Sequence, residues 1–119
     1  MHEAWHVFGI MHTQKRSDRD DYITVFPDRI TAGGLSQYTK CYACPIPEDV
    51  PYECHSIMHY PTWGFANSSL PTMEAKDPNS CRLVTATWLD LPTDNDWLSL
   101  EKKVCPNKEG MIFYLIKLV

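Results

Sequence analysis

No segment of this sequence stays apolar for the roughly 20 residues that a membrane-spanning helix requires, so we expect no membrane span. The first residues lack the charged and then apolar pattern of a signal peptide, and no leader is expected there. Basic residues are not in excess, because 11 Lys and Arg stand against 15 Asp and Glu. The formal net charge of −4 favours neither a nucleic acid nor an anionic membrane as partner.

The chain is long enough for one domain with a modest core, since it has 119 residues of which 44% are hydrophobic. Five cysteines are many for this length and indicate an oxidising compartment with disulfides. We therefore expect a secreted or extracellular protein. An odd number leaves at least one cysteine unpaired within the chain.

The most informative stretch lies at the start, where His2, Glu3, His6, Gly9 and His12 form the pattern H-E-x-x-H-x-x-G-x-x-H. Residues four apart share one face of a helix, so His2 and His6 can direct two imidazoles at one metal ion. Gly9 permits a sharp turn that returns His12 as a third ligand. Three nitrogen ligands with one open position are typical of catalytic zinc. An ordinary amphipathic helix with three histidines is the alternative.

Regular secondary structure is expected in three places: a helix over 2–9, a short strand over 23–26, and a helix over 96–104 with Asp96 as N-cap. Proline and turn residues predict loops over 41–54 and over most of 63–96. Residues 111–119 form an apolar tail that is too short to span a bilayer.

A second segment, Ser56-Ile57-Met58-His59-Tyr60, follows the zinc pattern at a distance. Together the two resemble the signatures of the astacin family of metzincin endopeptidases. Further similarity comes from Pro51 and Tyr52 before Ser56, from Thr72 and Lys76, from Leu98-Ser99, and from a charged motif made of Arg16, Asp18, Arg19, Asp20 and Tyr22.

The resemblance implies an α+β fold, namely the lower, C-terminal subdomain of a metzincin: a zinc-binding helix, a loop-rich region with a Met-turn at Met58, and a short C-terminal helix. It implies one Zn²⁺ per chain, bound by His2, His6 and His12. Glu3 is then the catalytic acid–base. Tyr60 is a switchable fifth ligand that stabilises the oxyanion; a plain buried tyrosine is the alternative.

The same resemblance implies that His59 is structural, and His55 is expected at the surface. Residues 1–106 correspond to a catalytic-domain fragment without its N-terminal subdomain, and residues 107–119 to the apolar tail. Thr13 replaces the glutamate that the family has after its third histidine, so activation by burial of a new N-terminus is not expected. The helix after Ser99 is expected to be shorter than in the family.

The pairing of the cysteines stays open in the sequence. Cys105 corresponds to a cysteine whose partner lies in the missing half of the family's domain. The other four, Cys41, Cys44, Cys54 and Cys81, allow three disulfide pairings. Alternatively, Cys41-x-x-Cys44 could form half of a second zinc site.

The predicted function is hydrolysis of protein or peptide substrates by a zinc-dependent endopeptidase, present here as a truncated catalytic domain. The alternative is a non-catalytic secreted zinc-binding module or inactive fragment. Other metzincins, such as the matrix metalloproteinases and adamalysins, fit less well because they lack the tyrosine that follows the Met-turn here. Residues 63–65 are candidates for the wall of the substrate pocket.

Overall fold

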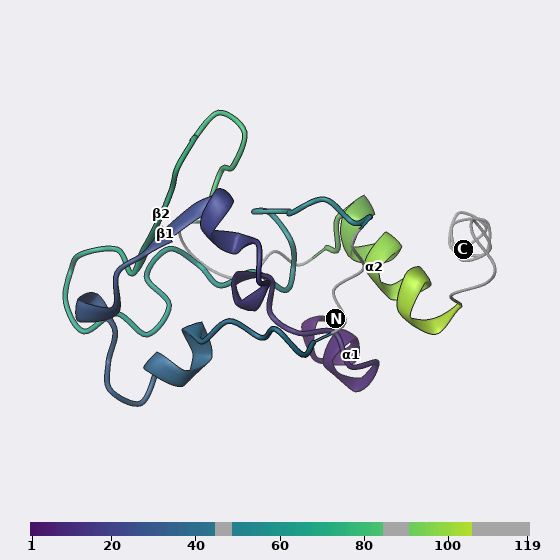
Figure 1. The fold of residues 1–119 in the computed structure, drawn as a ribbon, viewed down its shortest axis with the longest axis horizontal. Coiled ribbons are helices and arrows are strands. Elements are labelled where there is room, and N and C mark those ends of the chain that lie inside the picture. The colour runs from purple at the N-terminus through teal and green to yellow at the C-terminus, as the bar shows by residue number, and fades with distance from the viewer. Residues whose placement is uncertain (45–48, 85–90, 106–119) are drawn as a thin grey trace.

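The computed structural model describes residues 1–44, 49–84 and 91–105 (Figure 1). The helices are α1 (His2–Val7) and α2 (Asp94–Val104), and the strands are β1 (Ile23–Val25) and β2 (Met73–Ala75). Single 3-10 turns cover Thr13–Lys15, Arg19–Asp21, Pro27–Arg29 and Leu35–Tyr38. The mixture of helices with one small sheet agrees with the predicted α+β class. The predicted tail, residues 107–119, lies outside the described residues.

The sequence predicted a helix over 2–9, but α1 ends two residues earlier, at Val7. Gly9 has a φ of +78°, a left-handed conformation that glycine adopts without steric cost. The amide of Gly9 bonds the carbonyl of His6, and the amide of Ile10 bonds that of Trp5. These two bonds form a Schellman motif, which satisfies the last carbonyls and turns the chain away from the helix axis.

Strands β1 and β2 pair antiparallel, with Ile23 opposite Ala75 and Val25 opposite Met73. Ile23 and Met73 are completely buried, so their apolar side chains hold the pair together. The predicted strand over 23–26 is therefore confirmed, although it ends at Val25. Strand β2 is the exception to the loops expected over most of 63–96, because three residues are too few to display a recognisable alternation of apolar and polar side chains.

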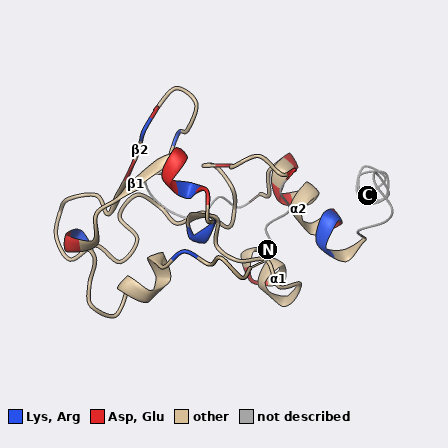
Figure 2. Ribbon diagram, viewed as in Figure 1, with Lys and Arg blue, Asp and Glu red and all other residues tan. Residues whose placement is uncertain are grey.

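Helix α2 begins at Asp94, and its N-cap is Thr93 rather than the predicted Asp96. The Thr93 hydroxyl accepts from the Asp96 amide, while the Asp96 carboxylate accepts from the Thr93 amide. This reciprocal capping box starts the helix two residues earlier than expected. Acidic residues lie in its first turn and Lys102 and Lys103 in its last (Figure 2), the arrangement that the helix dipole favours.

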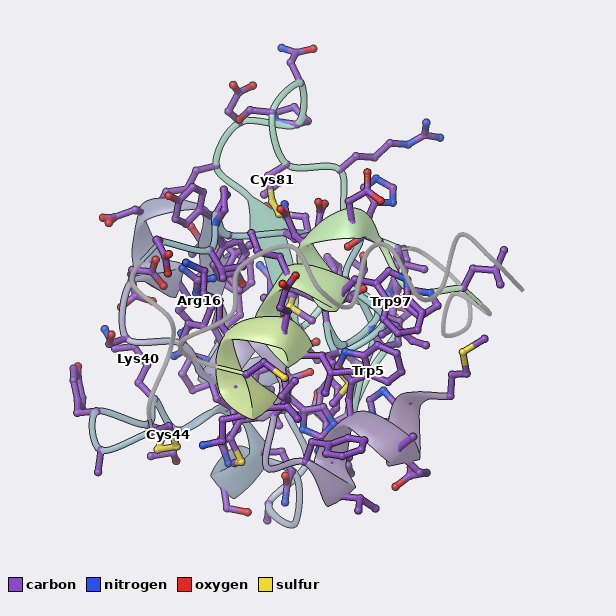
Figure 3. All side chains as sticks on the ribbon, turned by 90° about the vertical axis from the view of Figure 1, so that its right-hand side faces the viewer. Trp5, Arg16, Lys40, Cys44, Cys81 and Trp97 are labelled. Atoms are coloured by element: carbon purple, nitrogen blue, oxygen red, sulfur yellow. A yellow bond between two sulfur atoms is a disulfide. The ribbon has the colours of Figure 1, made fainter. Side chains whose placement is uncertain are left out.

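A compact apolar cluster joins α1 to α2. It contains the buried residues Trp5, Ile57, Met58 and Leu100, with Trp97 packed against them. The rings of Trp5 and Trp97 meet edge to face with their centroids 4.9 Å apart, and Figure 3 shows the two side by side. Helix α1, which carries His2 and His6, thus packs against α2, although the two helices are far apart in the sequence. None of the helices in the described ranges has the length and apolar character needed to cross a lipid bilayer.

The cysteines form two disulfides, Cys41–Cys44 and Cys54–Cys81, and Cys105 keeps a free, half-buried thiol. This selects one of the three pairings that the sequence left open. The alternative that Cys41-x-x-Cys44 forms half of a second zinc site was wrong, because the two sulfur atoms are bonded to each other in the disulfide. The expected loop over 41–54 has no helix or strand in its described residues, 41–44 and 49–54.

Candidate metal centre

Three histidine side chains converge beside α1. His2 and His6 lie one turn apart on the helix, and the Schellman turn at Gly9 brings His12 back beside them. The Nε2 atom of His6 is 3.1 Å from Nε2 of His2 and 3.1 Å from Nε2 of His12, and the remaining Nε2–Nε2 distance is 3.2 Å. Within the described part of the chain, this is the one group of three or more His, Cys, Asp or Glu residues suited to hold a metal ion.

The opposite nitrogens of two of these rings fix their tautomers. Nδ1 of His2 lies 2.7 Å from the carbonyl oxygen of Ile57, and Nδ1 of His6 lies 2.8 Å from that of Ile10. A carbonyl can only accept, so each Nδ1 carries the hydrogen and donates it. In the neutral rings both Nε2 atoms then present lone pairs to each other, an arrangement that is repulsive without a cation between them.

The spacing of these nitrogens suits zinc. A tetrahedral ion with Zn–N bonds of about 2.0–2.1 Å separates its nitrogen ligands by about 3.3–3.4 Å. The three observed separations, 3.1–3.2 Å, are close to that value. Histidine nitrogens whose other ring atom donates to a carbonyl are also the usual arrangement at zinc sites, because this bond orients the ring. The residues present therefore fit a zinc ion.

Electrostatics keep the third ring neutral. Burial, and then the neighbouring His6 and His2 rings, lower the pKa of His12 from 6.5 to about 3. Above that pH the His12 ring is uncharged. Its Nε2 can then serve as a ligand without first losing a proton.

The floor beneath the histidines is held by one buried carboxylate. Asp96 accepts from the Ser56 hydroxyl and, at 2.9 Å, from the Ile57 amide. The Thr13 hydroxyl donates to the Ser56 oxygen at 3.0 Å, and the Trp5 indole donates to the Asp96 carbonyl at 3.1 Å. Ile57 also carries the carbonyl that orients His2. Asp96 therefore connects α2 to the metal centre by holding Ile57 in place.

Sequence reasoning missed this supporting role. The sequence marked Asp96 only as a helix cap and Thr13 only as a departure from the family. The one indication in the sequence was Ser56 in the motif before Met58, and a serine alone does not reveal that its hydrogen-bond partner is Asp96. The buried Met58 lies where a Met-turn is expected, and its carbonyl accepts from the Thr13 amide at 2.9 Å.

Glu3 and Tyr60 face the same hollow as the histidines. The residues that line it are His2, Glu3, His6, His12, Tyr60, Pro61, Gly64 and Phe65. Glu3 is exposed in the first turn of α1, whereas Tyr60 is buried with its ring centroid 4.4 Å from that of His12. Burial raises the pKa of the Tyr60 hydroxyl, so it remains a hydrogen-bond donor at neutral pH. All five candidate site residues are thus brought together.

The other two histidines lie outside this group. His59 is completely buried, donates to the Tyr60 carbonyl and pairs with the Tyr52 hydroxyl, which confirms the structural role expected for it. His55, expected at the surface, is half-buried instead. Of the residues proposed for the pocket wall, Gly64 and Phe65 border the hollow and Trp63 does not.

Comparison with known proteins gives consistent matches. The family model for astacin, a family of peptidases, matches residues 1–89. Blastula protease 10 of Paracentrotus lividus is 38% identical over 79 residues, which are 66% of this chain and 13% of that protein. Meprin A subunit beta of Homo sapiens is 40% identical over 74 residues, 60% of this chain and 10% of that protein.

A solved structure also resembles the fold. High choriolytic enzyme 1, a hatching enzyme zinc-protease from Oryzias latipes, superposes with a TM-score of 0.73. The match covers 84% of this chain and 48% of that chain at 24% identity. The chain therefore spans about half the length of that enzyme and about a tenth to an eighth of the curated relatives described above.

Proposed function

Because this chain belongs to the astacin family of peptidases, we propose that it is the zinc-binding part of an endopeptidase catalytic domain. Members of this family are zinc metallopeptidases. The observation that carries the proposal is the convergence of three Nε2 atoms at 3.1–3.2 Å, with two of the rings oriented by carbonyl groups. In this proposal His2, His6 and His12 bind one Zn²⁺.

A zinc ion held by these three histidines would supply a Lewis acid, which lowers the pKa of a coordinated water molecule toward about 7. Glu3, beside His2 and open to solvent, accepts the proton of the attacking water through its carboxylate and returns it to the nitrogen of the leaving amine. The Tyr60 hydroxyl donates a hydrogen bond to the carbonyl oxygen as that oxygen gains negative charge. The substrate in this scheme is a protein or peptide.

The remaining residues orient these groups. The carbonyls of Ile57 and Ile10 hold the His2 and His6 rings with Nδ1 protonated, so Nε2 is the atom that would bind the ion. Asp96 anchors the segment that carries Ile57. Orientation of this kind matters because a misplaced ligand weakens both metal binding and catalysis.

Residues 1–106 are, in this proposal, the lower half of such a domain. The chain covers 48% of the hatching enzyme's chain. An extended peptide is positioned best between two walls, and positioning supplies much of an enzyme's rate. We therefore expect slow peptide hydrolysis by these 119 residues alone. The two disulfides support an extracellular location, since such bonds persist in oxidising compartments.

The test measures binding and hydrolysis separately on the 119-residue chain. Competition with a chelator gives the zinc affinity and stoichiometry, and a quenched fluorescent peptide gives the hydrolysis rate with and without chelator. One zinc per chain with chelator-sensitive hydrolysis supports the proposal. One zinc without any hydrolysis, even after an N-terminal extension supplies the second wall, favours the non-catalytic zinc-binding module instead.

A further inference from the structure

The main chain of Tyr60 is held on both sides by buried side chains. Its amide donates to Oε1 of Gln14 at 3.1 Å, and its carbonyl oxygen accepts from Nδ1 of His59 at 2.8 Å. Gln14 is completely buried, and His59 and Tyr60 are 2% and 6% exposed. Both peptide groups that flank the Tyr60 side chain are therefore fixed without help from solvent.

Gln14 connects this anchor to the metal centre. It lies two residues after His12, in the 3-10 turn Thr13–Lys15, and its carbonyl accepts from the Arg19 guanidinium at 2.8 Å. The same short turn thus follows a proposed zinc ligand and carries the acceptor for Tyr60. The His12 and Tyr60 rings that this turn connects have their centroids 4.4 Å apart.

The amide nitrogen of Gln14 indicates that this residue is present for its oxygen atom. Nε2 of Gln14 is buried and has no hydrogen-bond partner among the described residues. A buried, unpaired amide donor destabilises a fold, whereas an apolar side chain of similar length would fill the same space without that cost. The property that glutamine supplies here is the Oε1 acceptor, and that atom is the one that holds Tyr60.

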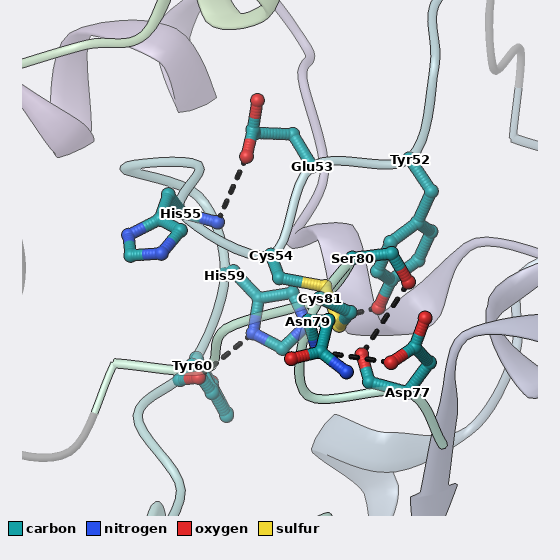
Figure 4. The surroundings of a disulfide bond; sticks show 10 residues. All are labelled: Tyr52, Glu53, Cys54, His55, His59, Tyr60, Asp77, Asn79, Ser80 and Cys81. Atoms are coloured by element: carbon teal, nitrogen blue, oxygen red, sulfur yellow. Dashed lines mark hydrogen bonds between the residues drawn. A yellow bond between two sulfur atoms is a disulfide. The ribbon is translucent and has the colours of Figure 1, made fainter. Parts of the chain in front are cut away.

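His59 is oriented in turn by the core. Its Nδ1 faces a carbonyl and must donate, so Nε2 accepts from the Tyr52 hydroxyl at 2.9 Å. The Tyr52 ring stacks on Tyr22 with centroids 4.6 Å apart and planes 8° apart. Figure 4 shows the His59 ring between Tyr60 and Tyr52, beside the Cys54–Cys81 disulfide. The donor to the Tyr60 carbonyl is therefore locked in one tautomer.

We propose that Gln14 and His59 are positioning residues, which clamp the two peptide groups of Tyr60 so that its phenol stays against His12 at the edge of the hollow. The inference rests on the proposed function, because it assigns a purpose to the place of Tyr60. It adds two residues that do not touch substrate or metal and act only through Tyr60.

The test uses paired variants of the full 119-residue chain with Zn²⁺ added. Gln14→Met removes the acceptor but keeps the length, and Gln37→Met, at a half-buried glutamine elsewhere, is its matched control. His59→Asn keeps a nitrogen donor near the place of Nδ1, whereas His59→Gln keeps an acceptor near the place of Nε2 and loses the donor to Tyr60. The readout is the NOE between the Tyr60 and His12 ring protons, with zinc affinity measured alongside.

We expect the NOE to fall at least threefold in Gln14→Met and His59→Gln, and to stay near the native intensity in Gln37→Met and His59→Asn. In a peptidase assay the two affected variants lose kcat, at least tenfold, while KM stays within twofold. A native NOE in Gln14→Met overturns the clamp. So does an equal loss in His59→Asn and His59→Gln, which would indicate general damage at that site.

Should Gln14→Met fail to fold, the His59 pair still decides the question. Failure of the proposed function is recognised separately: Tyr60→Phe would then hydrolyse peptide at the native rate. In that event the NOE comparison still reports whether the clamp exists, because it measures the place of the ring and not the reaction.

Discussion

At the scale of single residues, the proposed chemistry divides between ligands that only bind and one carboxylate that moves a proton. Glu3 follows His2 directly in α1, and its side chain is exposed to solvent. It makes no contribution to the Nε2 convergence of His2, His6 and His12. Zinc binding and proton transfer should therefore be separable by substitution.

We predict that Glu3→Gln keeps the zinc affinity within about threefold, since it leaves the three imidazoles in place, and lowers the peptidase rate by about 10²–10⁴-fold, the usual contribution of a general base. Chelator competition and a quenched-peptide assay measure the two quantities. Glu74→Gln, at an exposed glutamate on β2, is the control and should change neither. A turnover near the native value in Glu3→Gln would remove Glu3 from the mechanism.

A second residue-scale consequence concerns His59 and acid. Burial lowers the pKa of His59 from 6.5 to about 4. The unfolded chain therefore binds more protons than the folded chain between those values, and the stabilisation is complete above about pH 6.5 and lost as the pH falls toward 4.

We predict that the free energy of unfolding, measured by urea denaturation of the zinc-free chain, falls by up to about 3 kcal/mol from this group between about pH 7 and pH 4. His59→Asn cannot titrate there, so its pH dependence should be weaker by that amount. Parallel curves for the two proteins would contradict a neutral, buried His59 in the native state.

At the scale of elements, short motifs determined what could be predicted from the sequence. The spacing of His2, His6, Gly9 and His12 was sufficient for α1 and for its sharp end, because helix geometry and glycine act locally. Strand β2 was missed because its one partner, β1, lies about fifty residues earlier and three residues carry no periodicity. The Asp96 network was missed for the same reason, since its partners lie far away in the chain.

The Asp96 network predicts a difference between two substitutions at the start of α2. Thr93→Ala removes the cap and should cost about 1 kcal/mol of stability with zinc affinity unchanged. Asp96→Ala also leaves the Ser56 hydroxyl and the Ile57 amide without their buried acceptor. We expect a cost of about 3 kcal/mol or more and zinc binding about 10–100-fold weaker.

Urea denaturation and chelator competition on both variants test this comparison. An Asp96→Ala chain that binds zinc as tightly as Thr93→Ala would show that the Ile57 carbonyl does not depend on α2 for its place. A stability loss in Thr93→Ala as large as that in Asp96→Ala would reduce the network to an ordinary helix cap.

At the scale of the whole molecule, two apolar clusters and two disulfides hold a chain with little regular structure. The cluster around Ile23 and Met73 includes both Cys54 and Cys81, whereas Cys41 and Cys44 are half-buried and close a short turn. Cysteine spacing could not reveal this pairing, because it depends on which loops the core brings together. The two disulfides should contribute unequally to stability.

We predict that replacing Cys54 and Cys81 by serine costs about 2 kcal/mol more than replacing Cys41 and Cys44. The sequence separations are 27 and 3, and the loss of unfolded-chain entropy grows with the logarithm of the closed loop. Urea denaturation of both double variants measures the difference. Equal losses would show that the buried disulfide does not secure the core.

The most direct measurement of the central claim is a histidine-selective heteronuclear NMR titration of the 119-residue chain with Zn²⁺. The account predicts saturation at one equivalent, with the Nε2 signals of His2, His6 and His12 shifted, the Nδ1 atoms of His2 and His6 still protonated, and His59 unchanged. Saturation that shifts fewer than three of these Nε2 atoms, or that engages Nδ1 of His2 or His6 instead, would contradict it.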